Sequence, residues 1–335
     1  MSVNAGTTPA KGSAILRDIQ APVVDRLDHV AREMWRIIAV DSPIVSEVNE
    51  HLMLMKGKML RPTLLLLASE VEGTPEPRAL TLAAITELIH LATLVHDDAV
   101  DHSVLRRGMP TINALFSHQV SVIMRDFLYS RAVWELTRLG DLEPLEVFSA
   151  ATNELTIGEM RQLTALDALA FSEADYELLI RAKTASLFSA ACEAGALCGA
   201  RRHRQALARF GERLGMAFQV ADDLIDYTEA AETTGKPTGL DLREHKVTLP
   251  LIAALRTMSP AARARVDLLF ATDSPDDALI AEAVEIVRDE GGLEYARRRG
   301  EEYLEHAEEA LRTLPDGPAR AALAETLPYV MERRS

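Results

Sequence analysis

Apolar residues recur every three or four positions along much of this 335-residue chain. Residues 78–107 contain neither glycine nor proline, and their apolar positions form one stripe made of Leu82, Ile85, Ile89, Ala92, Val95 and Ala99. Residues 216–234 repeat the pattern with Ala217, Val220 and Leu224 on one side. This period is typical of amphipathic helices, and the alternating apolar runs that indicate strands are nearly absent. We therefore predict an all-α fold.

The predicted helices are separated by short breaks that are rich in glycine, proline, aspartate or threonine, at 72–79, 106–111, 233–239, 272–277 and 314–318. None of these breaks is long enough to be a linker between independent domains. We therefore expect a flexible N-terminal tail over residues 1–14 and a single large helical domain over residues 15–335.

Charge and composition narrow the class of protein. The net charge of −15 repels nucleic-acid phosphates. The two cysteines, Cys192 and Cys198, lie in an apolar stretch and indicate buried thiols in a reducing compartment. No uninterrupted apolar run approaches the ~18 residues that a membrane helix needs. We predict a cytoplasmic protein with no transmembrane segment and no nucleic-acid partner.

Two acidic clusters are the most informative feature of the sequence. The pattern D-D-x-x-D occurs in the segments HDDAVD and ADDLID, and its six carboxylates are Asp97, Asp98, Asp101, Asp222, Asp223 and Asp226. On a helix, the first and last aspartates of each cluster project from one face, one turn apart, and repel each other. Both clusters adjoin apolar sequence, so we place them at the rim of a core, where a cation must offset their charge.

The type of ligand in these clusters predicts the cation. Hard oxygen ligands without histidine or cysteine select Mg2+, or Mn2+ in its place. Bound Mg2+ commonly shares its coordination positions with substrate phosphates, so two facing clusters predict a clamp for a diphosphate. The alternative is two acidic turns on the surface of an acidic protein. That alternative explains less well why the pattern is repeated within apolar sequence.

Basic residues stand beside the acidic clusters, where they can receive phosphate groups. They are Arg106 and Arg107 after the first cluster, Lys236 and Lys246 after the second, and Lys58 and Arg61 at the start of an apolar helix. Three further polar residues lie in apolar sequence, namely His90, Lys183 and Gln219. Each of these three either serves the same site or is satisfied within the core.

With these motifs the chain resembles the trans-isoprenyl diphosphate synthases, also called polyprenyl synthetases. The resemblance rests on the segments GKMLRP, ELIHLATLVHDDAVDHSVLRRGMPT, TIGEMRQL, RAKTASLF, FQVADDLIDY and GKPTGLDL with KVTLP, which extend over most of the chain. It implies a homodimer of helical bundles of the isoprenoid synthase type. Each bundle would enclose a deep central cavity whose mouth carries the two aspartate motifs on facing helices.

The resemblance also assigns roles to the matching residues. Asp97, Asp101 and Asp222 would hold the Mg2+ ions that bridge an allylic diphosphate, supported by Asp98, Asp223 and Asp226. Contacts to that diphosphate would come from Arg106, Lys183, Thr184, Gln219 and Lys236. Isopentenyl diphosphate would bind Lys58, Arg61, His90 and Arg107. The catalytic set would be Asp97, Asp101, Asp222, Lys183 and Lys236.

The implied reaction is a prenyl transfer, in which the allylic C–O bond ionises in a water-excluding cavity and isopentenyl diphosphate attacks. The released diphosphate would accept the proton. Ala92 and Thr93 precede Asp97 where short-chain members of the family place bulky aromatic residues, so we expect a product longer than C20. In the alternative, a floor formed by Tyr129, Val133 or Trp134 closes the cavity at C15 or C20, as in farnesyl or geranylgeranyl diphosphate synthases.

Two other functions are less consistent with the motifs. A terpene cyclase usually has an Asn/Ser/Glu second motif, and a non-catalytic regulatory subunit typically lacks one of the two motifs. Both motifs here consist of aspartate. The chain departs from the family pattern at Met59, which replaces an arginine, and at Arg125 and His245, which replace glycines. None of these departures removes a predicted metal ligand.

Overall fold

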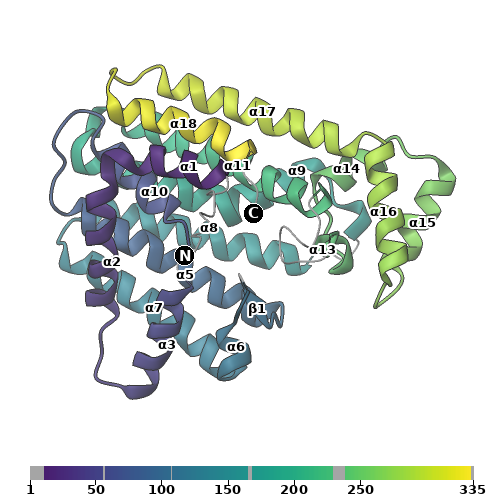
Figure 1. Ribbon diagram of the computed structural model, residues 1–335, viewed down its shortest axis with the longest axis horizontal. Coiled ribbons are helices and arrows are strands. Elements are labelled where there is room, and N and C mark those ends of the chain that lie inside the picture. Colours follow the sequence, from purple (N-terminus) through teal and green to yellow (C-terminus); the bar gives the residue numbers. More distant parts are fainter. Residues whose placement is uncertain (1–10, 56, 107, 165–167, 229–237, 333–335) are drawn as a thin grey trace, which may run out of the picture.

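The computed structural model describes residues 11–55, 57–106, 108–164, 168–228 and 238–332, with side chains from 15 onward except at 162–164. The regular secondary structure of these residues is helical apart from one short hairpin, so the predicted all-α fold is confirmed (Figure 1). Residues 1–10 of the predicted tail lie outside the described ranges, and the first helix begins at Lys11.

The α-helices in chain order are α1 (Lys11–Gln20), α2 (Val24–Ile38), α3 (Pro43–Leu54), α4 (Leu60–Ser69), α5 (Ala79–Val100), α6 (Ile112–Leu115), α7 (His118–Arg138), α8 (Leu142–Thr164), α9 (Glu173–Ile180), α10 (Ser186–Gly199), α11 (Arg204–Thr228), α13 (Leu240–Arg243), α14 (Leu249–Leu255), α15 (Pro260–Phe270), α16 (Asp277–Asp289), α17 (Gly292–Leu311) and α18 (Pro318–Glu332). The short 3-10 helices are η1 (Ala21–Val23), η2 (Ala168–Ala170) and η4 (Arg201–His203), and η3 (Arg181–Ala185) is a π-helix. Strands β1 (Leu105–Arg106) and β2 (Met109–Pro110) form the hairpin.

Helices α5 and α10 form the centre of the bundle (Figure 1). Helix α5 packs against α2, α4, α7 and α10, and α10 also packs against α4, α8 and α11. The four leucines at 64–67 of α4 are all fully buried, because this helix is covered on every side. Cys192 and Cys198 of α10 are free thiols inside this core, as predicted.

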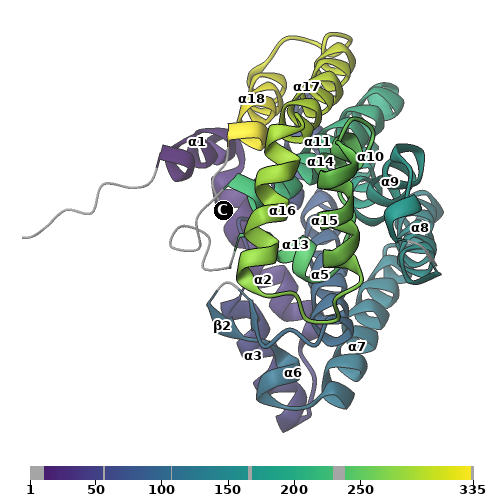
Figure 2. The ribbon, with the colours of Figure 1, turned by 90° about the vertical axis from the view of Figure 1, so that its right-hand side faces the viewer.

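A second, smaller apolar cluster lies at one end of the bundle. It is enclosed by α13–α16 and includes Tyr227 and Val266. Helices α15 and α16 lie side by side at this end, as Figure 2 shows. Val247 and Leu293 pack against both the main and the smaller cluster. The two apolar clusters are therefore continuous.

By length and composition alone, α5 could cross a membrane. Threonine, glutamate and histidine interrupt the apolar run of α5 but leave its mean hydropathy high. The length of its uninterrupted apolar runs therefore did not indicate a possible membrane span. In the structure, 67% of its apolar window is buried inside the bundle. The apolar surface of α5 is therefore used for packing within the protein.

The π-helix η3 is held closely between α8 and α11. A Cβ atom at Gly215 of α11 would lie 2.6 Å from the Cα atom of Ala185. A Cβ atom at Gly158 of α8 would lie 2.9 Å from the Cβ atom of Ala182. Glycine at these two positions therefore lets both helices pack directly on η3.

The helix that carries the first acidic cluster ends earlier than predicted. Helix α5 ends at Val100, and the backbone N–H of Asp101 caps it by donating to the carbonyl oxygen of Asp97 at 2.8 Å. His102 then adopts a left-handed φ of 50°, after which the hairpin β1–β2 begins. The prediction of a helix to about residue 107 is therefore wrong, and Arg106 lies on a strand.

Candidate active site

Both aspartate motifs lie at or near the C-terminal ends of long helices, α5 and α11. A helix C-terminus carries a partial negative charge, which adds to the repulsion among the carboxylates. Within the described ranges, no three histidine, cysteine, aspartate or glutamate side chains stand close enough together to hold a metal ion by themselves. The partners of each carboxylate therefore decide what the site can bind.

Asp98 of the first motif is buried and points to the hairpin rather than to solvent. The Nε atom of Arg106 lies 2.9 Å from each carboxylate oxygen of Asp98. This charge-assisted contact joins α5 to β1 and orients the guanidinium group of Arg106 through its Nε atom. Arg107 lies outside the described residues.

Asp97 faces a lysine from another part of the chain. The Nζ atom of Lys183 lies 3.8 Å from Oδ1 of Asp97 and 2.8 Å from Oε1 of Glu159. Burial raises the pKa of Asp97 to about 6, with Lys183 opposing this rise and Glu159 adding to it. The local cationic charge therefore does not fully compensate the partly buried Asp97 carboxylate.

Asp223 of the second motif is buried, and both of its carboxylate oxygens accept hydrogen bonds from the protein. Its Oδ2 atom accepts a hydrogen bond from the hydroxyl of Tyr176 at 2.6 Å, and its Oδ1 atom accepts one from Nε2 of Gln219 at 2.9 Å. The Oε1 atom of Gln219 accepts a hydrogen bond from the hydroxyl of Thr184 at 2.7 Å. Burial raises the pKa of Asp223 well above its usual range, and the two hydrogen bonds oppose that rise. Asp223 thus connects α9, η3 and α11.

The other two aspartates of the second motif differ in their surroundings. Asp222 is exposed. Asp226 accepts hydrogen bonds from the backbone N–H groups of Leu240 at 3.0 Å and Asp241 at 3.1 Å. These bonds cap the short helix α13 and hold residues 239–241 against α11. Asp226 therefore positions the segment that follows the second motif.

That segment carries a lysine that reaches the first motif. The Nζ atom of Lys246 lies 3.3 Å from Oδ2 of Asp101 and 2.7 Å from Oε2 of Glu244. Burial alone would lower the pKa of Lys246, but these acidic groups raise it. Burial raises the pKa of Asp241 to about 7, the charge of Asp226 adds to the rise, and Lys246 opposes it. Lys246 therefore lies among carboxylates from both sides of the site.

Two connections bring the aspartate motifs to the same space. Lys183 of η3 contacts Asp97, and the adjacent Thr184 contacts Gln219 on the helix of the second motif. Lys246, which follows the second motif, contacts Asp101 of the first. The expected placement of both motifs on facing helices agrees with these contacts.

A second group of predicted residues lies on α4 and α5. The Nη1 atom of Arg61 is 3.2 Å from Nε2 of His90, and the guanidinium group of Arg61 lies 4.5 Å from the ring centre of Phe188. Lys58 is exposed, and its carbonyl oxygen accepts a hydrogen bond from Gln20 at 2.9 Å. Arg61 and His90 therefore lie together, as a shared ligand site requires.

The three departures from the family pattern have visible consequences. Met59 has a left-handed φ of 54° and packs against the core, so no cation stands at its position. Arg125 helps burial to lower the pKa of His96, beside the first motif. His245 has a φ of 55°, and its Nε2 atom lies 3.2 Å and 3.1 Å from the carbonyl oxygens of Leu269 and Thr272. His245 thereby anchors the segment before Lys246 to the end of α15.

The residues proposed for the wall and for the floor of the product cavity differ in how exposed they are. Ala92 is buried, and Thr93, one turn before Asp97, is partly exposed. Trp134, proposed as a floor residue, is 51% exposed on α7, with Arg131 and Arg138 over its ring. Its indole is therefore on the surface of this chain. The hydroxyl of Tyr129 contacts Thr152 of α8 at 3.1 Å, and Val133 is partly buried.

Sequence reasoning missed several polar residues of this region. Glu159 lies in the segment TIGEMRQL and Asp241 in GLDL. Both segments carry the family resemblance, but neither acidic residue was given a role. Tyr176 has no sequence signal, because a single tyrosine in a helix resembles any core residue. Lys236, predicted to be catalytic, lies outside the described residues.

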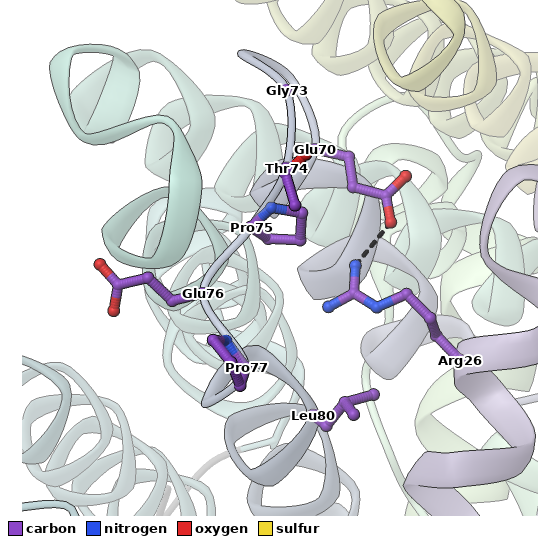
Figure 3. Close-up of a pocket in the computed structure, with 8 residues that line it drawn as sticks. All are labelled: Arg26, Glu70, Gly73, Thr74, Pro75, Glu76, Pro77 and Leu80. Atoms are coloured by element: carbon purple, nitrogen blue, oxygen red, sulfur yellow. Dashed lines mark hydrogen bonds and ion pairs between the residues drawn. The ribbon is translucent and has the colours of Figure 1, made fainter.

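A pocket elsewhere in the fold is separate from this site (Figure 3). It has a volume of about 450 Å³ and lies at the connection between α4 and α5, where Pro75 and Leu80 line it. An ion pair between Arg26 and Glu70 crosses it. Because α5 rises about 1.5 Å per residue, its N-terminal end is roughly 25 Å from the first aspartate motif. None of the predicted site residues lines this pocket.

Comparisons with known proteins agree with the geometry. A family model described as polyprenyl synthetase matches residues 42–287. The all-trans-nonaprenyl-diphosphate synthase (geranyl-diphosphate specific) of Rhodobacter capsulatus is 39% identical over 95% of this chain and 98% of its own. The octaprenyl diphosphate synthase of Escherichia coli is also 39% identical, over 84% of this chain and 88% of its own.

Solved structures confirm the likeness in three dimensions. The polyprenyl synthase of Caulobacter crescentus, crystallised with calcium and isoprenyl diphosphate, superimposes with a TM-score of 0.91. It is 34% identical, and the match covers 96% of this chain and 98% of that one. Because the family model, the sequence relatives and the fold agree, this chain belongs to the polyprenyl synthetase family and is a prenyltransferase, as its sequence predicted.

Proposed function

We propose that the chain condenses isopentenyl diphosphate with an allylic diphosphate to make a trans-polyprenyl diphosphate longer than C20. The observation that carries this proposal is the pair of lysine contacts joining the motifs. Lys183 lies at Asp97 while its neighbour Thr184 contacts the second helix, and Lys246 reaches Asp101. Carboxylates and lysines around one space fit a diphosphate that binds with metal ions.

The donor set fits hard divalent ions. Asp97, Asp101 and Asp222 offer only carboxylate oxygens, which suit Mg2+ or Mn2+, and the Caulobacter crescentus relative was solved with calcium, another hard ion. The partial burial of Asp97, which raises its pKa, also favours a cation there. These three residues would hold the ions, which would stabilise negative charge on the departing diphosphate. Since no three carboxylates converge within the described ranges, diphosphate oxygens would complete the coordination.

The remaining aspartates act through protein contacts. Asp98 holds Arg106, Asp223 holds the network of Tyr176 and Gln219, and Asp226 holds the backbone before Lys246. We assign them to support of the site. This division follows from which carboxylate oxygens already accept hydrogen bonds from the protein.

The residues of this chain supply cationic and polar groups for both substrates. We assign Arg106, Lys183, Thr184, Gln219 and Lys236 to the allylic diphosphate. The cluster of Arg61 and His90 on α4 and α5, with Lys58 and Arg107, is assigned to isopentenyl diphosphate. Arg61 is held by His90 and by the ring of Phe188, which orients its guanidinium group before substrate binds.

Two observations support a long product. The relatives from Rhodobacter capsulatus and Escherichia coli are named as nonaprenyl and octaprenyl diphosphate synthases. The small side chains of Ala92 and Thr93 precede Asp97 on α5, and Trp134, the bulkiest of the candidate floor residues, is 51% exposed. A growing apolar tail would therefore extend along α5, away from the first motif.

The assay for this function uses the purified protein with Mg2+ and labelled isopentenyl diphosphate. C5, C10, C15 and C20 allylic diphosphates are supplied separately, and the dephosphorylated products are resolved by length. A ladder that extends beyond C20 is expected. A ladder that stops at C15 or C20 would contradict the long product, and hydrocarbon products or no incorporation would favour a cyclase or a regulatory subunit.

Asp97→Asn and Asp222→Asn are each expected to lower kcat by about 100-fold or more, because each removes a metal ligand. Asp97 has a folded pKa of about 6, above its usual value of 3.8, so its ionisation weakens the metal-free fold as pH rises through this range. Asp97→Asn should therefore melt no lower than the unsubstituted protein at pH 7. Kinetics and thermal melting measure both effects.

Asp267→Asn serves as the control, because this exposed carboxylate of α15 pairs with Arg263 away from the site. Its kcat should match that of the unsubstituted protein. Full activity in either Asp97→Asn or Asp222→Asn would refute the assignment of that residue as a metal ligand.

Thr93→Phe is expected to shorten the product, because a phenyl ring one turn before Asp97 would block the path along α5. The control is Thr313→Phe, two residues after the end of α17, since Thr93 and Thr313 make the same kind of bond to a carbonyl three residues earlier. Product length distributions of both variants are compared by chromatography. An unchanged ladder in Thr93→Phe would show that the product does not pass this residue.

We also propose a homodimer. Ile123 and Trp134 on α7 are 64% and 51% exposed, and Leu142 and Met160 on the neighbouring α8 are 77% and 56% exposed. Exposed large apolar side chains on two neighbouring helices favour a protein contact. Light scattering should give twice the chain mass of 36.8 kDa, and Ile123→Lys should shift the protein to the monomer mass. A monomeric unsubstituted protein would contradict the proposal.

We propose a cytoplasmic location, supported by the two free, buried thiols and by the packing of α5 within the bundle. Fractionation of cells that express the chain, followed by detection in the soluble and membrane fractions, tests it. Recovery in the membrane fraction would contradict it.

A further inference from the structure

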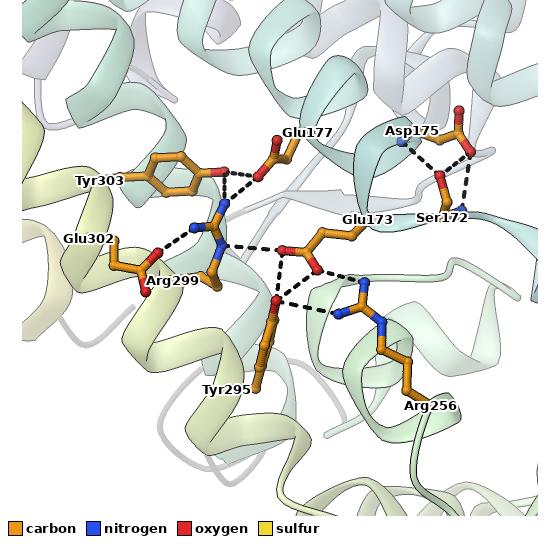
Figure 4. A network of polar contacts seen from close by, with 9 residues as sticks. All are labelled: Ser172, Glu173, Asp175, Glu177, Arg256, Tyr295, Arg299, Glu302 and Tyr303. Carbon is orange, nitrogen blue, oxygen red and sulfur yellow. Dashed lines mark hydrogen bonds and ion pairs between the residues drawn. The ribbon is translucent and has the colours of Figure 1, made fainter.

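Helix α9 and the π-helix η3 follow each other without a break and form one arm between α17 and α11. Figure 4 shows that its outer side is held by side chains from α17 and from the end of α14. Its inner side contacts the helix of the second aspartate motif. What fixes this arm therefore also fixes Lys183, which η3 carries to the first motif.

The outer contacts form a clamp on two glutamates of α9. Glu173 accepts hydrogen bonds from Nη2 of Arg256 at 2.6 Å and from the hydroxyl of Tyr295 at 2.8 Å. Glu177 accepts one from the hydroxyl of Tyr303 at 2.7 Å, and Arg299 pairs with both glutamates. Both glutamates and their arginine partners are partly exposed, and although Tyr303 is 4% exposed, its partner Glu177 is 31% exposed. Water can therefore reach a glutamate oxygen that loses its donor.

The inner contact is made by Tyr176, which lies between the two clamped glutamates in the sequence. Its side chain is 1% exposed, and its hydroxyl donates to Asp223, which is 3% exposed. Water cannot replace this bond, since both groups are buried. The loss of the hydroxyl would leave one oxygen of Asp223 without its donor.

The π-helix gives this bond a direct connection to the site. Asp223 also accepts from Gln219, and Gln219 accepts from Thr184 of η3. The arm is thus bonded to α11 at two points, at Tyr176 in α9 and at Thr184 within the π-helix. Such π-turns are frequent at functional sites, where they shift the register of the side chains that follow.

We propose that Tyr176 is a positioning residue of the prenyl transfer site. Its hydroxyl fixes the register of the α9–η3 arm on α11, so that Lys183 stays beside Asp97 and Asp223 stays turned away from the substrate. The inference rests on the proposed function for its meaning in catalysis. The contact of Tyr176 with Asp223, and its effect on η3, stand independently of that function.

The test compares Tyr176→Phe with Tyr303→Phe. Both variants keep an aromatic ring and lose one hydroxyl that donates to a carboxylate of the α9–α11 region, one on the inner side and one on the outer side. Tyr176→Phe is expected to lower kcat about tenfold and to raise the KM of the allylic diphosphate, since it loosens the placement of Lys183. The KM of isopentenyl diphosphate should not change, because Arg61 and His90 stand on α4 and α5.

A second measurement is independent of activity. Hydrogen–deuterium exchange of the peptide that covers residues 181–188 should be faster in Tyr176→Phe than in the unsubstituted protein. Tyr303→Phe should retain both the slow exchange and the unsubstituted kcat. If the unsubstituted protein has no synthase activity, the proposed function fails, yet the exchange rates still decide whether Tyr176 holds η3.

Two outcomes would overturn the inference. In the first, Tyr176→Phe keeps the unsubstituted kcat and exchange rate, so the hydroxyl positions nothing. In the second, Tyr176→Phe and Tyr303→Phe lose rate and exchange protection equally, so the arm responds to any lost contact. Melting temperatures of both variants are recorded, and all rates are measured well below them.

Discussion

The site depends on holding six carboxylates at the ends of two apolar helices, where burial and mutual repulsion both oppose their charge. The chain meets this constraint in two ways. Three of the aspartates accept bonds from an arginine, from a buried tyrosine and amide, or from backbone N–H groups. Asp97 and Asp101 instead face lysines that come from distant parts of the sequence, and Asp222 is exposed.

This arrangement links the fold to the chemistry. Lysine contacts at 3.3 Å and 3.8 Å are long enough to be exchanged when a diphosphate arrives with its cations. The buried bonds of Asp98 and Asp223 are closer and more enclosed, so they keep the two helices and the hairpin in place. The close packing at Gly215 and Gly158 holds the π-helix that carries Lys183. Side chains in fixed contacts thus surround the carboxylates whose lysine contacts can be exchanged. Such a preorganised site favours transition-state stabilisation.

Much of this was readable from the sequence, because the repeated aspartate pattern and the helical period are both local signals. They predicted the all-α fold and the family, and they singled out Lys183 and Gln219, which lie beside Asp97 and Asp223. The early end of α5 was missed, since the left-handed turn at His102 has no glycine to mark it. The role of Tyr176 could not be predicted, because its partner Asp223 lies 47 residues away in the chain. Contacts between distant segments depend on how the helices pack, and a single sequence does not show this packing.

The most direct test of this account is a crystal structure of the protein with Mn2+ and an unreactive allylic thiolodiphosphate, in which anomalous scattering locates the metal ions. The account predicts Mn2+ bound to Asp97 and Asp101 on one side of the diphosphate and to Asp222 on the other. Asp98 and Asp223 should keep their contacts with Arg106 and Tyr176. Mn2+ bound to Asp98 or Asp223, or a diphosphate bound away from both motifs, would contradict it.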